Sequence, residues 1–228
     1  MWTPEETQVV FLALRVALTV VAVALLPGLG VAWVLARWES RWSLLLRGVV
    51  MLPLVLPPVV TGYVLLRLFG RRSALGELWF AVTGNHIAYT TAACVLAAAV
   101  VGFPLLVESM RLSLAAVDPR LEAVSRTLGR GPWATFRSVT LPLAWPGVVA
   151  GAVLAFARAL GEFGATIVLA GNIEGETRQI PVAVYTLLNQ PGSTAAVTRL
   201  TLVSVALSLA ALLAAAWFGG RRQRRFAG

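Results

Sequence analysis

Long apolar stretches without charged side chains are the feature that most restricts how this chain can fold. A helix needs about 20 consecutive apolar residues to cross the hydrocarbon core of a bilayer. Five stretches come close to that length: residues 16–36, 48–66, 87–107, 141–157 with a continuation past Arg158, and 200–220. The composition, 58% hydrophobic and 13% charged, is also typical of membrane proteins. These stretches predict an all-α integral membrane fold with about five transmembrane helices.

Five spans leave no room in 228 residues for a separate soluble domain. We therefore expect a single transmembrane domain over residues 1–228. The sequence leaves open a sixth, shorter span or a re-entrant helix, either around residues 75–82 or around residues 181–188.

Arginine placement predicts the orientation of the spans. All nineteen basic residues are arginine, and an outside N-terminus puts twelve of them in inner loops and the C-terminal tail, against six near the outer boundary. Arg71 and Arg72 run against this bias. The segment before Arg15 holds two acids and no base, so the first span is expected to be retained. We predict an outside N-terminus and a cytoplasmic C-terminus. The net charge of +9 then reflects membrane topology, because the arginines flank spans, and the expected contact is with membrane lipid and not with nucleic acid.

A polar stretch between the third and fourth spans, residues 118–147, is predicted to form a short docking helix. Asp118 can cap a helix that starts at Pro119, and Gly129 supplies a stop. Leu121, Val124 and Leu128 recur at helical spacing and form one apolar stripe. A helix this short is marginal by itself and needs a partner surface.

Helix breakers occur inside the second span, in the run LPLVLPPVVTG, which also contains Thr61. Its prolines, Pro53, Pro57 and Pro58, remove backbone donors and introduce kinks. Unpaired backbone at that depth is tolerated when it is buried in protein or lines a watery cavity. The cluster therefore indicates either a pathway-lining helix or kinking that improves packing.

The fourth span holds the intramembrane charges, Arg158 and Glu162. A charge at mid-bilayer costs about 2.5–3.5 kcal/mol on insertion scales, so such residues rarely face lipid. Their spacing of four places them one helical turn apart, where they can pair, and Thr166 lies one turn further on. The pair serves either helix packing or a transport pathway.

The fifth span carries Thr201, Ser204 and Ser208 on one face. Such a hydroxyl stripe can line a route for an oxyanion, although hydrogen bonding between helices is its more frequent use.

Several kinds of chemistry lack the residues that they need. The P-loop pattern GxxxxGK[ST] requires a lysine, and the chain has none, so ATP energy must come from another subunit. One His, one Cys and one Asp, far apart in sequence, provide no metal site, and no cofactor is expected. We expect a transport subunit and not an enzyme.

The docking stretch resembles the EAA loop of ABC-transporter permeases, in which a Leu-Pro pair follows a glycine by thirteen residues. Here the glycine is Gly129 and the pair is Leu141 and Pro142. Aligned from Gly129, the usual glutamate of the family falls on Ala123, whereas Glu122 lies about 100° around the helix. The resemblance implies a cytoplasmic coupling loop over residues 108–146. Its implied ATPase contacts are Arg120, Leu121, Glu122, Val124, Ser125, Leu128, Gly129 and Pro142.

Residues 52–66 and 156–192 resemble the permease subunit of molybdate ABC importers. The part FARALGEFGA is similar in sulfate permeases, and GNIEGETRQIPVAVYTLL, residues 171–188, favours the molybdate branch. The resemblance implies a type I importer permease fold in the cytoplasmic membrane of a bacterium or archaeon. A sulfate or tungstate permease, or a non-transporting scaffold subunit, are the alternatives.

The same resemblance implies the partners and the working parts. Two copies of the chain would form the pathway, above a separate ABC ATPase, and an extracytoplasmic molybdate-binding protein would deliver the anion. The outer loop with Glu174, Glu176 and Arg178 is a candidate docking surface for that protein. The pathway candidates are Thr61, Arg158, Glu162, Thr166, Thr201 and Ser204.

Overall fold

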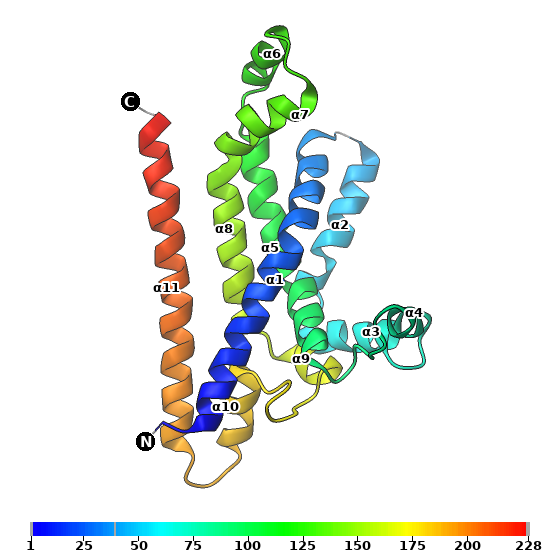
Figure 1. Cartoon of the computed structure of the whole chain (residues 1–228), viewed down its shortest axis with the longest axis vertical. Coiled ribbons are helices and arrows are strands. Elements are labelled where there is room, and N and C mark those ends of the chain that lie inside the picture. The colour runs from blue at the N-terminus through cyan, green and yellow to red at the C-terminus, as the bar shows by residue number, and fades with distance from the viewer. Residues whose placement is uncertain (1, 39, 227–228) are drawn as a thin grey trace.

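The computed structural model describes residues 2–38 and 40–226, and every regular element in this part of the chain is helical (Figure 1). In chain order the elements are α1 (Pro4–Arg37), α2 (Arg41–Val55), α3 (Pro58–Phe69), α4 (Ala74–Thr83), α5 (Thr91–Ala115), α6 (Pro119–Thr127), α7 (Pro132–Thr135), the π-helical turn η1 (Phe136–Thr140), α8 (Leu141–Leu160), α9 (Gly164–Leu169), α10 (Ile180–Leu188) and α11 (Thr194–Phe226). The predicted all-α fold is confirmed.

Four helical segments of the described chain are long and apolar enough to cross a membrane: α1, α5, the joined α7–η1–α8, and α11. They correspond to the first, third, fourth and fifth predicted spans. Helix α1 begins well before residue 16 because a capping box starts it. The Glu6 amide donates to Thr3 Oγ1 (3.2 Å), and the Thr3 amide donates to Glu6 Oε2 (2.8 Å).

The second predicted span, residues 48–66, is not one straight helix. Helices α2 and α3 meet at an angle of 113°, with Leu56 and Pro57 between them in extended or proline-restricted conformations. Pro57 and Pro58 have no backbone N–H to continue the hydrogen-bond ladder of α2. The proline run therefore turns the chain sharply where hydropathy alone predicts a continuous span.

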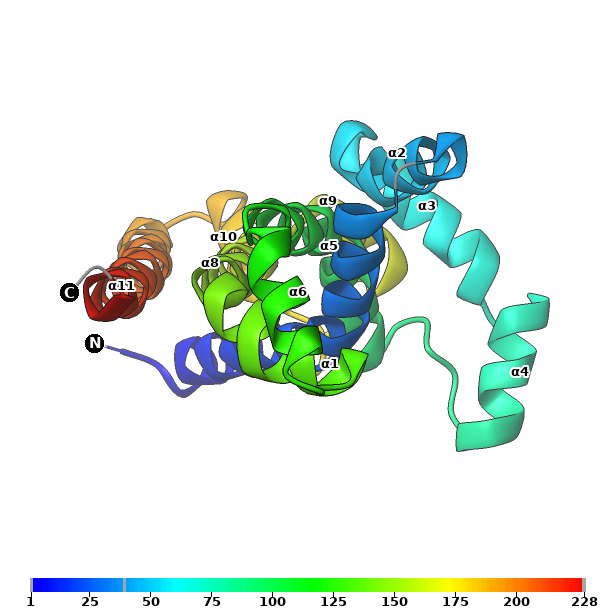
Figure 2. The same cartoon turned by 90° about the horizontal axis from the view of Figure 1, so that it is seen from above.

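Neither short segment considered as a sixth span is long enough to cross a membrane. Helix α4 has 10 residues and α10 has 9, against the roughly 20 that a crossing needs. Helices α3 and α4 project sideways from the bundle, as the view from above shows (Figure 2). The described chain therefore has four spans, or five if the bent pair α2–α3 counts as one.

Helices α5 and α8 form the central seam of the bundle. A Cβ at Gly147 would lie 2.2 Å from the Ser113 Cβ, and one at Gly151 would lie 2.8 Å from the Leu106 carbonyl oxygen. The absence of these side chains lets the two backbones approach closely, as in many membrane helix pairs. The hydroxyl of Ser109 uses this proximity to donate to the Gly147 carbonyl (3.1 Å).

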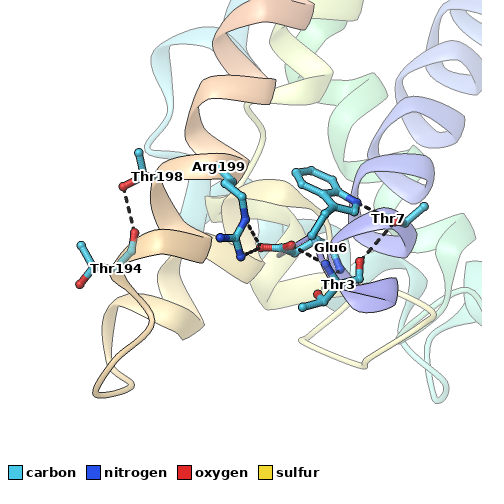
Figure 3. Close-up of polar contacts among 7 residues, drawn as sticks. Thr3, Glu6, Thr7, Thr194, Thr198 and Arg199 are labelled. Atoms are coloured by element: carbon cyan, nitrogen blue, oxygen red, sulfur yellow. Dashed lines mark hydrogen bonds and ion pairs between the residues drawn. The ribbon is translucent and has the colours of Figure 1, made fainter.

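Helix α11 lies along one side of the bundle, against α8 and α10 (Figures 1 and 2). Near its start Arg199 pairs with Glu6 of α1 at 2.7 Å (Figure 3). The N-terminus lies at the end of the molecule opposite α6, and α11 finishes at the α6 end (Figure 1). This arrangement fits a topology in which α6 and the C-terminus share one side of the membrane. The assignment of this shared side to the cytoplasm stays a prediction.

Candidate functional site

Helix α6 forms where the capping residues predict it, at one tip of the molecule (Figure 1). The Asp118 carboxylate accepts from the Arg120 amide (2.8 Å), which satisfies a free donor of the first turn. After the helix ends, Gly129 adopts a φ of +79°, which an L side chain rarely tolerates. The sequence signals at both ends of the predicted docking helix are confirmed.

The apolar stripe of α6 has no covering element in the described structure. Leu121, Val124 and Leu128 are 48%, 58% and 76% exposed. Large apolar side chains grouped at a protruding tip are typical of a surface that binds a partner. Arg120 on the same helix is exposed as well.

The opposite side of α6 is held to the protein by polar contacts. Glu122 forms an ion pair with Arg37 at the end of α1 and accepts from Thr140 Oγ1 of η1 (2.6 Å). Ser125 is buried, and its hydroxyl lies 3.1 Å from that of Thr135 in α7. The structure thus separates the predicted coupling residues into an exposed apolar group and a group turned inward.

Pro142 belongs to neither group. It lines a pocket of about 320 Å³ beside Leu121, at the junction of η1 and α8. The assignment of Gly129, Pro142 and the other coupling residues to ATPase contact stays a prediction.

The second candidate site is the break between α8 and α9. The sequence predicts Arg158 and Glu162 on one continuous helix, but α8 ends at Leu160 and α9 begins at Gly164. The pairing is nevertheless present, with 2.7 Å between Arg158 Nη2 and Glu162 Oε2. Glu162 is only 1% exposed, and its other oxygen accepts from the Ala165 amide (2.8 Å). The carboxylate therefore closes the break, because it is ion-paired with Arg158 and accepts a hydrogen bond from a free amide at the start of α9.

Helix α3 packs directly on α9 at this break. A Cβ at Gly62 would lie 2.7 Å from the Ala165 carbonyl oxygen, and one at Gly164 would lie 2.7 Å from Pro58 Cβ. Such an approach needs glycine on both sides. The proline run and the FARALGEFGA segment, about a hundred residues apart, thereby form one contact.

Two buried hydroxyls on these helices have no hydrogen-bond partner within the described chain. They belong to Thr61 of α3, 4% exposed, and Thr166 of α9, 0% exposed. A buried hydroxyl without a partner costs free energy, and most folds avoid it. The structure brings together α3, which carries Thr61, and α9, which carries Thr166, with Glu162 in the break before α9 and Arg158 at the end of α8.

Thr201 and Ser204 do not join that group. They lie on α11, which packs against α8, α10 and the start of α1. Neither side chain forms a hydrogen bond to another helix in the residues that the structure covers. The interhelical hydrogen bonding that the sequence favours is therefore not seen within one copy of the chain.

The loop after α9 is ordered by its own contacts. Arg178 pairs with Glu174 (3.5 Å) and donates from Nε to Asn172 Oδ1 (2.8 Å). These two charged residues line a pocket of about 400 Å³ that also includes Glu6. Sequence reasoning missed the Glu6–Arg199 pair beside it (Figure 3), because 193 positions separate the partners. The signal in the sequence that could have indicated this pair was an acidic and a basic residue, each at the end of an apolar span.

The chain is similar to known proteins along most of its length. A family model described as the binding-protein-dependent transport system inner membrane component matches residues 28–224. The molybdenum transport system permease protein ModB of Escherichia coli strain K12 is 49% identical over 218 residues, which cover 94% of both chains. The protein of the same name from Haemophilus influenzae is 44% identical, with 96% of both chains covered. That of Mycobacterium tuberculosis is 42% identical over 90% of this chain and 78% of its own.

Solved structures show the same fold at low sequence identity. A chain of the inward-facing MetNI methionine ABC transporter superposes with a TM-score of 0.73 at 16% identity, over 97% of this chain and 99% of that one. A chain of a bacterial alginate ABC transporter gives 0.72 at 13% identity, over 98% and 80%. The predicted type I importer permease fold is confirmed.

Proposed function

The chain belongs to the family of binding-protein-dependent transport system inner membrane components, and we propose that it is the membrane-spanning subunit of an ATP-driven molybdate importer. The substrate rests on relatives up to 49% identical that are named molybdenum transport permeases. The observation that carries a coupling role is the uncovered apolar face of α6 at the tip of the molecule. A surface of this kind suits docking to a separate ATPase.

Force applied to α6 can reach the membrane helices through its inward contacts. Glu122 links it to the end of α1 and to η1, and Ser125 links it to α7, which continues into α8. Capping at Asp118 and the turn at Gly129 keep the helix whole. Closure of an ATPase dimer on two such helices would then move α1 and α8 as the pathway alternates between its outer and inner openings.

The route for the anion is proposed to pass the contact between α3 and α9. Thr61 and Thr166 offer hydroxyls that no protein group uses, and Arg158 offers a positive charge that Glu162 partly balances. A weak, partly neutralised site of this kind suits conduction, because a tight anion site would trap the ion.

The proposed transporter contains two copies of the chain, which together enclose the pathway. Thr201 and Ser204 lie on α11, which is available to contact the second copy. An extracytoplasmic binding protein delivers molybdate. The N-terminus lies outside and α6 lies in the cytoplasm, as the arginine distribution favours.

Uptake of labelled molybdate, in cells with and without this gene, tests the proposal. We expect gene-dependent uptake that unlabelled tungstate blocks and an equal excess of sulfate does not. Strong competition by sulfate would move the substrate to the sulfate branch. Absence of gene-dependent uptake, with the partner proteins expressed, would contradict the importer role itself and favour a scaffold subunit.

A further inference from the structure

A second cationic region lies on the arm formed by α3 and α4, away from the coupling end. Arg67 is in the last turn of α3, and Arg71 and Arg72 are in the turn that leads to α4. The three arginines line one open pocket of about 600 Å³. None of the residues that line it is acidic.

The three arginine side chains have no partner within the part of the chain that the structure describes. The six ion pairs found there use other arginines, and no hydrogen bond engages the guanidinium of Arg67, Arg71 or Arg72. Three like charges that line one pocket repel one another, so this grouping does not stabilise the arm by itself. A bound anion would remove the repulsion.

Two further groups of the pocket favour a negative ligand. Ser73 and Ala74 line it, so the first amides of α4 lie beside it. The Gly76 amide is already bonded to Ser73 Oγ, and Glu77 in the first turn offsets part of the positive end of the helix. Tyr89 also lines the pocket, and its phenol has no partner in the described chain. Arginine forks, helix amides and a phenol are all donors, which is the donor set that an oxyanion needs.

Tyr89 also connects the pocket to α9. Its φ of +64° is the only positive value at a non-glycine residue in the described chain, and such a conformation is strained for a bulky side chain. The Tyr89 amide donates to the carbonyl of Leu169, the last residue of α9 (3.1 Å). Its ring packs on Gly171, which has a φ of +74°. The strained residue therefore holds the pocket beside the helix that carries Thr166.

We propose that this pocket binds a tetrahedral oxyanion on the side of the membrane that carries the N-terminus. Its role is to capture the transported anion before that anion enters the route between α3 and α9, and this role rests on the proposed function. Binding of an anion would explain why Arg71 and Arg72 run against the charge bias of the spans. A lipid headgroup phosphate has the same chemistry, and the experiment separates the two sources.

The test uses a single thiol placed in the pocket. The only cysteine of the chain, Cys94, is buried, so Ala74→Cys provides one accessible thiol in the wall. The purified complex in lipid-free detergent is labelled with an uncharged maleimide, with molybdate or chloride present at equal ionic strength. Molybdate at about four times its Kd is expected to slow labelling about fivefold, because the free pocket falls by the factor 1 + [L]/Kd.

The control variants separate binding at the arginines from general effects. Changing Arg67, Arg71 and Arg72 to glutamine in the Ala74→Cys chain is expected to abolish the protection. Arg15→Gln, which removes another unpaired arginine outside the pocket, is expected to leave it unchanged. Val82→Cys, 78% exposed on the same arm and outside the pocket, is expected to react at one rate with either anion.

The same labelling in nanodiscs identifies the source of the anion. Arginine-dependent protection by phosphatidylglycerol, with none by molybdate in detergent, would assign the pocket to lipid phosphate and overturn its role in capture. Absence of protection by both molybdate and phosphatidylglycerol would show that the pocket is not an oxyanion site. Labelling does not depend on transport, so arginine-dependent protection of the Ala74→Cys complex by molybdate, with no molybdate import by the wild-type protein, would contradict the proposed function alone.

Discussion

Helices α6 and α9 are both too short to be stable by themselves, and the protein holds them in opposite ways. Helix α6 directs its polar contacts inward, through Glu122 and Ser125, and leaves its apolar side chains uncovered. Helix α9 has no exposed residue, and it encloses the unpaired hydroxyl of Thr166. An apolar face left open points to a protein partner, whereas a polar atom left unpaired inside points to a polar ligand in passage. Substitutions at each helix test this contrast.

The largest effect is expected from Gly62→Leu in α3. Its Cβ would lie 2.7 Å from the backbone of Ala165, so α3 and α9 must separate. We expect the free energy of unfolding to fall by about 3 kcal/mol and uptake to be lost. Thermal unfolding of the purified chain and molybdate uptake measure the two effects. Gly48→Leu is the matched control, because nothing lies within 4 Å of a Cβ there. Equal stability of the two variants would refute the close packing of α9.

The next effect concerns the ion pair at the break. Arg158→Gln leaves Glu162 buried without its cation, which is expected to cost about 2 kcal/mol, less than for a fully enclosed pair because Arg158 is 26% exposed. Adding Glu162→Gln removes the uncompensated charge and is expected to restore most of the stability. Uptake is expected to stay at least about tenfold low in both variants, since the pathway lacks its cation. Uptake at the wild-type rate by an assembled double variant would exclude Arg158 from the pathway.

At α6, the double variant Leu121→Ser and Leu128→Ser is expected to weaken ATPase binding about tenfold, because apolar anchors supply much of the affinity of an interface. Its unfolding free energy is expected to change by less than about 0.5 kcal/mol, since both side chains are exposed. Co-purification of the ATPase and thermal unfolding are the measurements. Arg126→Gln, on the same helix and off the stripe, serves as control. An ATPase that stays bound and coupled would show that this face is not the interface.

The smallest effect is expected from Glu122→Gln, which removes the ion pair with Arg37 but keeps an acceptor for Thr140. The pair is partly exposed, so we expect a loss of about 1 kcal/mol in unfolding free energy. ATPase binding is expected to persist, while the number of ATP molecules hydrolysed per imported anion rises because α6 is less firmly attached. Glu77→Gln on α4 is the control. A reduced affinity for the ATPase at an unchanged ratio would place Glu122 in the interface after all.

Much of the fold was accessible to prediction because its signals are local. Four spans and the all-α class follow from runs of apolar residues, and the ends of α6 follow from Asp118 and Gly129. The family resemblance, drawn from the Gly–Leu-Pro spacing and from residues 52–66 and 156–192, is confirmed by relatives that match along nearly the whole chain. The ATPase contacts and the pathway residues stay predictions.

The candidate sites were only partly accessible, for reasons that differ between residues. Helical spacing identified the Arg158–Glu162 pair but not the break between them, because Glu162 bonds to the start of α9 instead of continuing α8. Glu122 as an ATPase contact stays a prediction, and the sequence did not show its bonds to Arg37 and Thr140, which lie 85 and 18 positions away. The arginine pocket was visible only as an exception to the charge bias.

The sequence by itself determined the membrane class, four of the long spans and the short capped helix between two of them. Each of these depends on hydropathy or capping within one continuous segment of the chain. Only the tertiary structure decided that α3 turns away by 113° to meet α9, and that Glu6 pairs with Arg199. These features depend on the close approach of backbones and charges that are far apart in sequence, and hydropathy along one segment does not encode which distant segment will lie against it.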